Sequence, residues 1–92
     1  MSNQPGSQLI IRGITSSGKI FRPSDWAERL AGILSTFDLD SRINYSAYVH
    51  PTTVNGIKCI LLDRALERID GRAWSFMTGF ARDNDLVMED AD

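Results

Sequence analysis

The chain has 92 residues, of which 42% are hydrophobic and 24% are charged, a composition typical of one globular domain and not of a disordered chain. A domain of this size buries about two-thirds of its unfolded surface, which argues against a large catalytic cleft in the monomer. The formal net charge of −2 gives no general attraction to nucleic acid or to an anionic membrane.

No apolar run approaches the roughly 18 residues that a membrane-spanning helix needs, and residues 1–8 lack the basic and apolar regions of a signal peptide. Cys59 is the single cysteine, so neither an internal disulfide nor a cysteine-rich zinc site can form. We therefore expect a cytoplasmic protein without membrane contact, metal or cofactor.

The composition along the chain predicts a flexible polar leader, one domain and an acidic tail, at residues 1–7, 8–89 and 90–92. The apolar, β-branched run at 8–15 predicts the first strand. A turn containing Gly18 follows it, and residues 19–21 favour a short returning strand.

A helix is expected to begin near Pro23 or Ser24, because proline suits the first helical turn and a serine hydroxyl can accept a bond from a free backbone N–H. Apolar residues then recur at helical spacing. They predict a buried stripe made of Trp26, Leu30, Ile33, Leu34 and Phe37.

The pair Asn55-Gly56 predicts a two-residue type I′ turn, because both positions of that turn require positive φ. The turn joins two expected strands, at residues 43–53 and 57–62. In an antiparallel hairpin the residue numbers of two directly opposed residues always add to the same value. The resulting pairs are Val54 with Ile57, Thr52 with Cys59, and His50 with Leu61.

Residues 63–69 favour a short helical segment, and Asp70 can cap a longer helix at about 71–83. Asn84 is expected to end that helix in a left-handed conformation, and residues 86–88 to form an edge strand. The inward positions of the longer helix are expected to be Ala73, Met77, Phe80 and Ala81, with Trp74 and Phe76 at its flanks.

The expected order is strand, helix, strand, strand, helix, strand. It predicts an α+β protein: a two-layer sandwich of βαββαβ type, ferredoxin-like or related, with the helices packed on one face of a mainly antiparallel sheet. A true strand at 19–21 would break this order. Such folds carry many unrelated functions, so the function has to be argued from a site.

Three segments carry a resemblance to a known family: GKIFRPSDWAERL at 18–30, NGIKC at 55–59 and FARDNDL at 80–86. With these segments the chain resembles a small bacterial family known as a domain of unknown function, and the likeness covers nearly all of the chain after the leader. The resemblance implies a bacterial, proteobacterial, cytoplasmic protein. It implies no catalytic residues, because the family has no established activity.

The start of the first expected helix gathers the chain's densest run of side chains suited to recognition: Lys19, Arg22, Asp25, Trp26 and Arg29. A helix N-terminus offers free N–H groups to an anion, which Lys19 and Arg22 can supplement. Another interpretation needs no ligand, because Asp25 and Arg29 can form an i,i+4 ion pair and Trp26 can be a core residue. It leaves Lys19 and Arg22 without a role.

Three other patterns have simpler structural explanations. The arginines at 64, 68 and 72 would line a continuous helix as a phosphate-binding stripe, but Asp70-Gly71 interrupts it, which argues against nucleic acid. His50 and Cys59 share a face of the hairpin, yet no oxyanion-hole motif accompanies them and the neighbours of Cys59 are apolar. Residues 13–19 match a phosphate loop by letter, but Ile20 stands where Ser or Thr should ligate magnesium.

The leading hypothesis is a non-catalytic interaction or regulatory module that binds a protein partner or a second copy of itself, with Arg22, Trp26 and Trp74 as anchors. It requires at least one tryptophan to be partly exposed. The alternative is a sensor that binds an anionic metabolite between the turn at Lys19 and Arg22 and the first helix. We expect no catalysis; the remaining alternatives are a weak nucleic-acid binder using the arginines and a thiol enzyme using Cys59.

Overall fold

The computed structural model describes residues 7–23, 25–34 and 47–91. Within these ranges the chain forms a four-stranded antiparallel sheet in the order β2-β3-β1-β4. The strands are β1 (Gln8–Thr15), β2 (Val49–Val54), β3 (Ile57–Asp63) and β4 (Leu86–Asp90), and the helices are α1 (Trp26–Leu34), α2 (Ala65–Ile69) and α3 (Gly71–Asp83). The connectivity is βαββαβ with its second helical connection divided in two, which confirms the predicted α+β fold.

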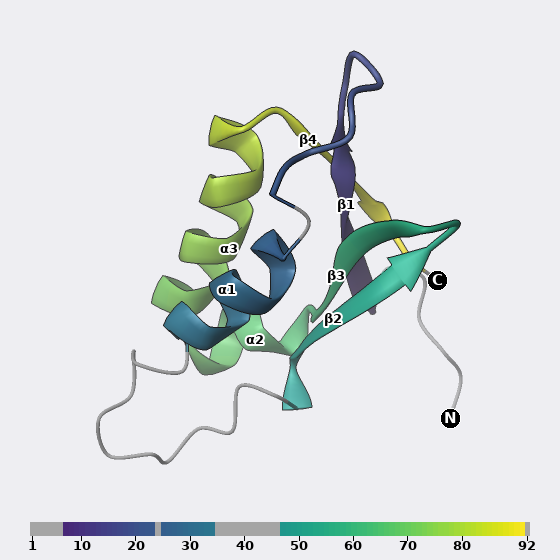
Figure 1. Ribbon diagram of the computed structural model, residues 1–92. Coiled ribbons are helices and arrows are strands. Elements are labelled where there is room, and N and C mark those ends of the chain that lie inside the picture. Colours follow the sequence, from purple (N-terminus) through teal and green to yellow (C-terminus); the bar gives the residue numbers. More distant parts are fainter. Residues whose placement is uncertain (1–6, 24, 35–46, 92) are drawn as a thin grey trace.

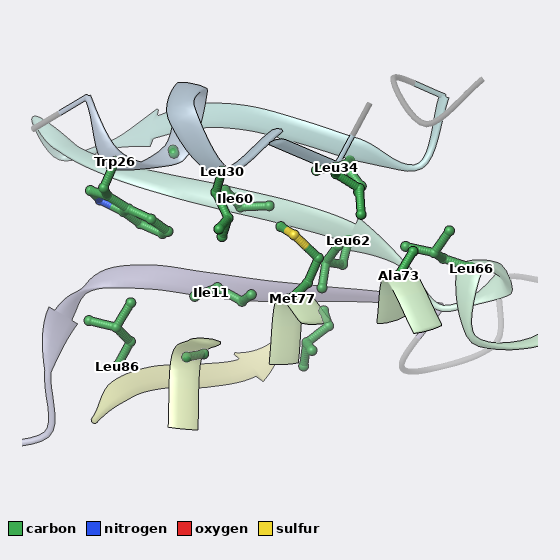
Figure 2. Packing of buried hydrophobic residues seen from close by; sticks show 14 residues of the cluster. Ile11, Trp26, Leu30, Leu34, Ile60, Leu62, Leu66, Ala73, Met77 and Leu86 are labelled. Atoms are coloured by element: carbon green, nitrogen blue, oxygen red, sulfur yellow. The ribbon is translucent and has the colours of Figure 1, made fainter. Parts of the chain in front are cut away.

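The helices cover one face of the sheet (Figure 1), and a cluster of buried apolar side chains fills the space between the two layers. Figure 2 shows Ile11 and Ile60 from the central strands among Leu30 and Met77 from the helices. Because successive side chains of a strand point to opposite faces, alternate residues of β1 and β3 reach this core. Burying each such side chain stabilises the fold by about 1.5–3 kcal/mol.

The β2–β3 hairpin forms as its turn sequence predicts. Asn55 and Gly56 have φ values of 53° and 79°, as a type I′ turn requires. The register confirms the three predicted pairs, Val54 with Ile57, Thr52 with Cys59, and His50 with Leu61. The strand β2 begins only at Val49, and residues 43–46 of the strand expected at 43–53 lie outside the described residues.

The short returning strand expected at 19–21 forms only in part: the N–H of Thr15 donates to the carbonyl of Lys19 and the N–H of Phe21 to the carbonyl of Gly13, both at 2.9 Å. The structure has a single antiparallel bridge there, between Ile14 and Ile20. Further along β1, at Ile11, one edge of the strand is already paired with Ile60 of β3 and the other with Met88 of β4. No free edge remains for a longer returning strand, so the ferredoxin-like order is kept.

Asp70 caps the start of α3 as predicted, whereas Asn84 does not end the helix in the left-handed conformation that was expected. The Oδ1 atom of Asp70 accepts hydrogen bonds from the backbone N–H groups of Arg72 and Ala73, at 3.1 and 3.3 Å. Asn84 has a φ of −105°, and the left-handed residue is Asp85, with a φ of 58°. Asn84 satisfies the helix end by another route, because its Nδ2 donates to the carbonyl of Phe80 at 2.9 Å.

The first helix is shifted from its expected start, because α1 begins at Trp26 and not at Pro23 or Ser24; Ser24 lies outside the described residues. Trp26, Leu30 and Leu34 are buried at a spacing of four, as the stripe predicts. Phe37, the last residue of that stripe, also lies outside the described residues. At the far edge of the sheet, β4 extends to Asp90 and is longer than the expected 86–88.

Candidate binding surface at α1 and α3

Three aromatic rings join the loop before α1, the first turn of α1 and the C-terminal half of α3. The ring of Trp26 stacks on Phe80, with 6.0 Å between the ring centroids and 10° between the planes. Phe21 meets both rings edge-on, at 5.6 Å from Trp26 and 5.8 Å from Phe80. Such geometries are favourable for aromatic pairs, so the cluster holds the loop and both helices together.

Beside this cluster lies a cavity of about 300 Å³, which we call the α1 hollow; it is lined by Phe21, Pro23, Trp26, Arg29, Leu30, Ile33 and Phe80. Six of these seven side chains are apolar, so the hollow suits an apolar group. It reaches the molecular surface, because Arg29 is exposed and Ile33 is 50% exposed.

A second cavity of about 300 Å³ lies on α3, lined by Ser75, Phe76, Gly79, Phe80 and Asp83. Phe80 lines both cavities, so they are neighbours on one surface. The second cavity has more polar lining than the α1 hollow, with a hydroxyl from Ser75 and a carboxylate from Asp83. The α1 hollow is therefore the more apolar of the two.

The carboxylates next to the α1 hollow are already paired with cations. Asp25 accepts from the Nε of Arg29 at 2.8 Å, which is the i,i+4 pair that the sequence allows. Glu28 lies 3.5 Å from the Nζ of Lys58. These pairs are solvent-exposed, so each is worth less than about 1 kcal/mol.

Lys19 and Arg22 are exposed, and neither side chain forms an ion pair with any residue that the structure describes. Arg22 stands between Phe21 and Pro23, which both line the α1 hollow. Lys19 belongs to the preceding turn, where its backbone N–H lies 3.2 Å from the Oγ1 of Thr15. Arg22 therefore adds an exposed positive charge next in sequence to two lining residues, and Lys19 adds another two residues before Phe21.

The structure brings together only part of the cluster Lys19, Arg22, Asp25, Trp26 and Arg29. Trp26 and Arg29 line the α1 hollow, whereas Asp25 serves as the partner of Arg29. Trp26 is 4% exposed, so it is a core residue whose ring forms one wall. Trp74 is half-buried on α3 and meets the requirement for a partly exposed tryptophan.

Sequence reasoning missed the roles of Ile33 and Phe80. The stripe predicted Ile33 to be buried with Leu30, but at a helical step of 3.6 residues it lies at the edge of that stripe, and it is exposed. Phe80 was expected to point inward, and it is half-buried because it lies over the edge of the core. The periodicity located both residues on the apolar side of their helices but not at a surface cavity.

The pair His50 and Cys59 does not form a catalytic dyad in this structure. Cys59 is 1% exposed, and its Sγ lies 3.4 Å from the carbonyl oxygen of Ile57. His50 is exposed, with its Nε2 at 3.2 Å from the carbonyl oxygen of Ala47. Within the described parts of the chain, no three or more His, Cys, Asp or Glu side chains gather to hold a metal ion.

The arginines at 64, 68 and 72 are not aligned on one helix, which confirms the predicted interruption. Asp70 has extended backbone angles between α2 and α3. Arg64 forms an ion pair with Asp90, and Arg72 lies 3.9 Å from Asp70. Among the described strands, the sheet face away from the helices includes no Phe, Tyr or Trp side chain on which a base could stack; its one ring is the imidazole of His50. None of the helices in the described ranges is long and apolar enough to cross a membrane.

Comparison with known proteins supports the resemblance to a family of unknown function. Residues 6–91 match the model of a family described as a protein of unknown function, DUF3579. The chain belongs to this family. No curated protein matches it.

A solved relative supports the fold of this DUF3579 member. A solution structure, described as the first structural representative of its family, is 32% identical to the chain and superposes with a TM-score of 0.78. The match covers 99% of this chain and 84% of the other. DUF3579 membership assigns no activity to any residue, so the function has to be argued from the α1 hollow.

Proposed function

We propose that this DUF3579 protein is a non-catalytic binding module whose α1 hollow receives an apolar side chain of a protein partner. The observation that carries the proposal is an apolar cavity of about 300 Å³ that reaches the surface between α1 and α3. Protein interfaces obtain most of their binding energy from a few apolar or aromatic anchors seated in such pockets. A cavity of this size can hold one or two apolar side chains, as when a protein recognises a short peptide segment of its partner.

The chemistry of the lining favours binding over catalysis. Of the described residues that line the α1 hollow, Arg29 alone has a charged side chain. A guanidinium does not deprotonate in proteins, so it cannot serve as a general base. Its charge is also held by Asp25 at 2.8 Å. The described lining thus offers contact area and orientation for a partner, and none of its side chains is suited to proton transfer.

The exposure of Ile33 gives this proposal a direct test. Ile33 is 50% exposed and lines the hollow, whereas Ile69 on α2 is 44% exposed and does not line it. Ile33→Asp introduces a charge into the site, and Ile69→Asp introduces the same charge elsewhere. The two variants therefore form a matched pair.

The experiment is a selection of random displayed peptides on the immobilised protein, followed by affinity measurements by fluorescence anisotropy. We expect the selected peptides to share an apolar residue, and their affinity to fall about tenfold or more in Ile33→Asp, because a desolvated anchor is lost. Ile69→Asp should bind them as the unaltered protein does. Equal binding by both variants, or no selected peptide, would contradict the proposal.

A second copy of the chain is another possible occupant of the hollow, and sedimentation distinguishes it. Self-association of the unaltered protein that Ile33→Asp abolishes would replace the separate partner with a second copy. A monomer at all concentrations, together with peptide binding, supports the separate partner.

Among the described residues, Lys19 and Arg22 have no ion-pair partner, which favours a second candidate function, a sensor for small anionic metabolites. At the N-terminus of α1, the N–H of Trp26 is bonded to the carbonyl of Pro23 at 3.1 Å, so this N–H is not offered to a ligand. Under this candidate, carboxylate or phosphate metabolites raise the melting temperature of the unaltered protein and not of Arg22→Ala. A flat response across a metabolite panel would contradict it.

A further inference from the structure

We infer that the segment entering the α1 hollow carries acidic residues beside its apolar anchor, an inference that rests on the proposed function. The hollow selects the anchor by its apolar lining. The positive charges near the hollow favour acidic residues next to that anchor in the bound segment, because an interface matches positive potential with negative potential.

The charged side chains near the α1 hollow include more cations than carboxylates. Asp25 and Glu28 are engaged by Arg29 and Lys58, so they do not offset the other positive charges. Lys19 and Arg22 have no ion-pair partner among the described residues. Their charges remain available to carboxylates from outside the chain.

Arg29 adds donors that point to solvent at the cavity wall. Its Nε is bonded to Asp25 at 2.8 Å, but a guanidinium has five N–H donors and the side chain is 69% exposed. A second carboxylate can therefore bond to Arg29 without breaking the pair with Asp25. When the apolar anchor of a bound segment occupies the hollow, an acidic residue next to that anchor can contact the guanidinium of Arg29.

The local charge is opposite to that of the whole chain. The chain has a net charge of −2, yet Arg29 lines the α1 hollow, and Arg22 and Lys19 lie in the segment that leads into it, where Arg22 stands between the lining residues Phe21 and Pro23. At the second cavity both signs of charge are present: Asp83 belongs to the lining, and the guanidinium of Arg82 lies 4.0 Å from where a β-carbon on the lining residue Gly79 would stand. We therefore expect a preference for acidic segments at the α1 hollow and not at the second cavity.

The test uses three synthetic peptides that share one central Phe and differ only in its flanks, which are Glu, Ser or Lys. Their affinities for the full chain are measured by fluorescence anisotropy at low and at high salt. We expect the Glu-flanked peptide to bind most tightly and the Lys-flanked peptide most weakly. Added salt should reduce this difference, because exposed charges are screened.

Two charge-reversal variants locate the effect. Arg22→Glu should weaken binding of the Glu-flanked peptide about two- to fivefold, as expected for an exposed pair, and strengthen binding of the Lys-flanked peptide. Arg68→Glu reverses an exposed charge on α2, outside the hollow, and should leave the affinities unchanged.

The outcomes separate this inference from the proposed function. Equal affinity of the three peptides, lost in Ile33→Asp, would overturn the acidic flank and leave the binding module standing. A preference for Glu flanks that survives Arg22→Glu and falls in Arg68→Glu would also overturn the inference. Absence of binding by all three peptides would overturn both proposals.

Discussion

Gly13 of β1 lies directly against the indole of Trp26. A β-carbon at Gly13 would stand 2.9 Å from the Nε1 of Trp26 and 2.2 Å from the carbonyl oxygen of Lys58, closer than such atoms approach in proteins. The lack of a side chain at this position lets Trp26 reach the sheet while its ring stacks on Phe80. One wall of the α1 hollow therefore depends on a glycine in the first strand.

Gly13→Ala should lower the free energy of unfolding by about 1–3 kcal/mol, because the backbone of Lys58 cannot easily give way. Gly32→Ala in α1 is the control, since a β-carbon there meets nothing within 4 Å. That variant should be neutral or more stable by up to about 1 kcal/mol, because alanine favours helix over glycine. Urea unfolding of both variants measures the difference, and equal stabilities would contradict the role given to Gly13.

Asp70→Ala should cost about 0.5–2 kcal/mol of stability, because α3 loses the acceptor for the N–H groups of Arg72 and Ala73. Asp70→Asn keeps an acceptor oxygen and should retain most of the stability. Thermal and urea unfolding test the pair. If the alanine variant is as stable as the asparagine variant, the cap does not hold the helix start.

The thiol of Cys59 should react slowly with a thiol reagent in the native protein, because the side chain is 1% exposed. The labelling rate should rise with urea as the sheet opens, in step with unfolding followed by circular dichroism. Rapid labelling without urea would show that the thiol is accessible, and would restore the thiol-enzyme alternative.

Local sequence signals predicted much of the fold because each acts over a few residues. Asn55-Gly56 determines the hairpin through positive φ at both positions, and Asp70 marks a helix start through its carboxylate. The strand expected at 19–21 is limited to one bridge, between Ile14 and Ile20, because farther along β1, at Ile11, both edges are already occupied by β3 and β4. The choice of Asp85 over Asn84 as the left-handed residue also depends on a side-chain bond, to Phe80.

The sequence predicted the part of the candidate site that comes from the start of α1 and the segment before it, but not the part that comes from α3. The residues around Arg22 and Trp26 stood out because charge, aromatic rings and a helix start coincide there. Phe80 joins them from a helix more than fifty positions away, a juxtaposition that only the packing of α1 and α3 produces. Periodicity alone does not distinguish a stripe residue in the core from one at a cavity rim, and Ile33 is such a rim residue.

The most direct test of the binding module is a nuclear magnetic resonance titration of the nitrogen-labelled protein with the Glu-flanked Phe peptide. The account predicts shifts of the Trp26 indole N–H and of the backbone amides of Ile33 and Phe80, which line the hollow. The amides of His50 and Ile69, outside it, should not move. Shifts centred on His50 or Ile69, with the Trp26 indole unchanged, would contradict the account.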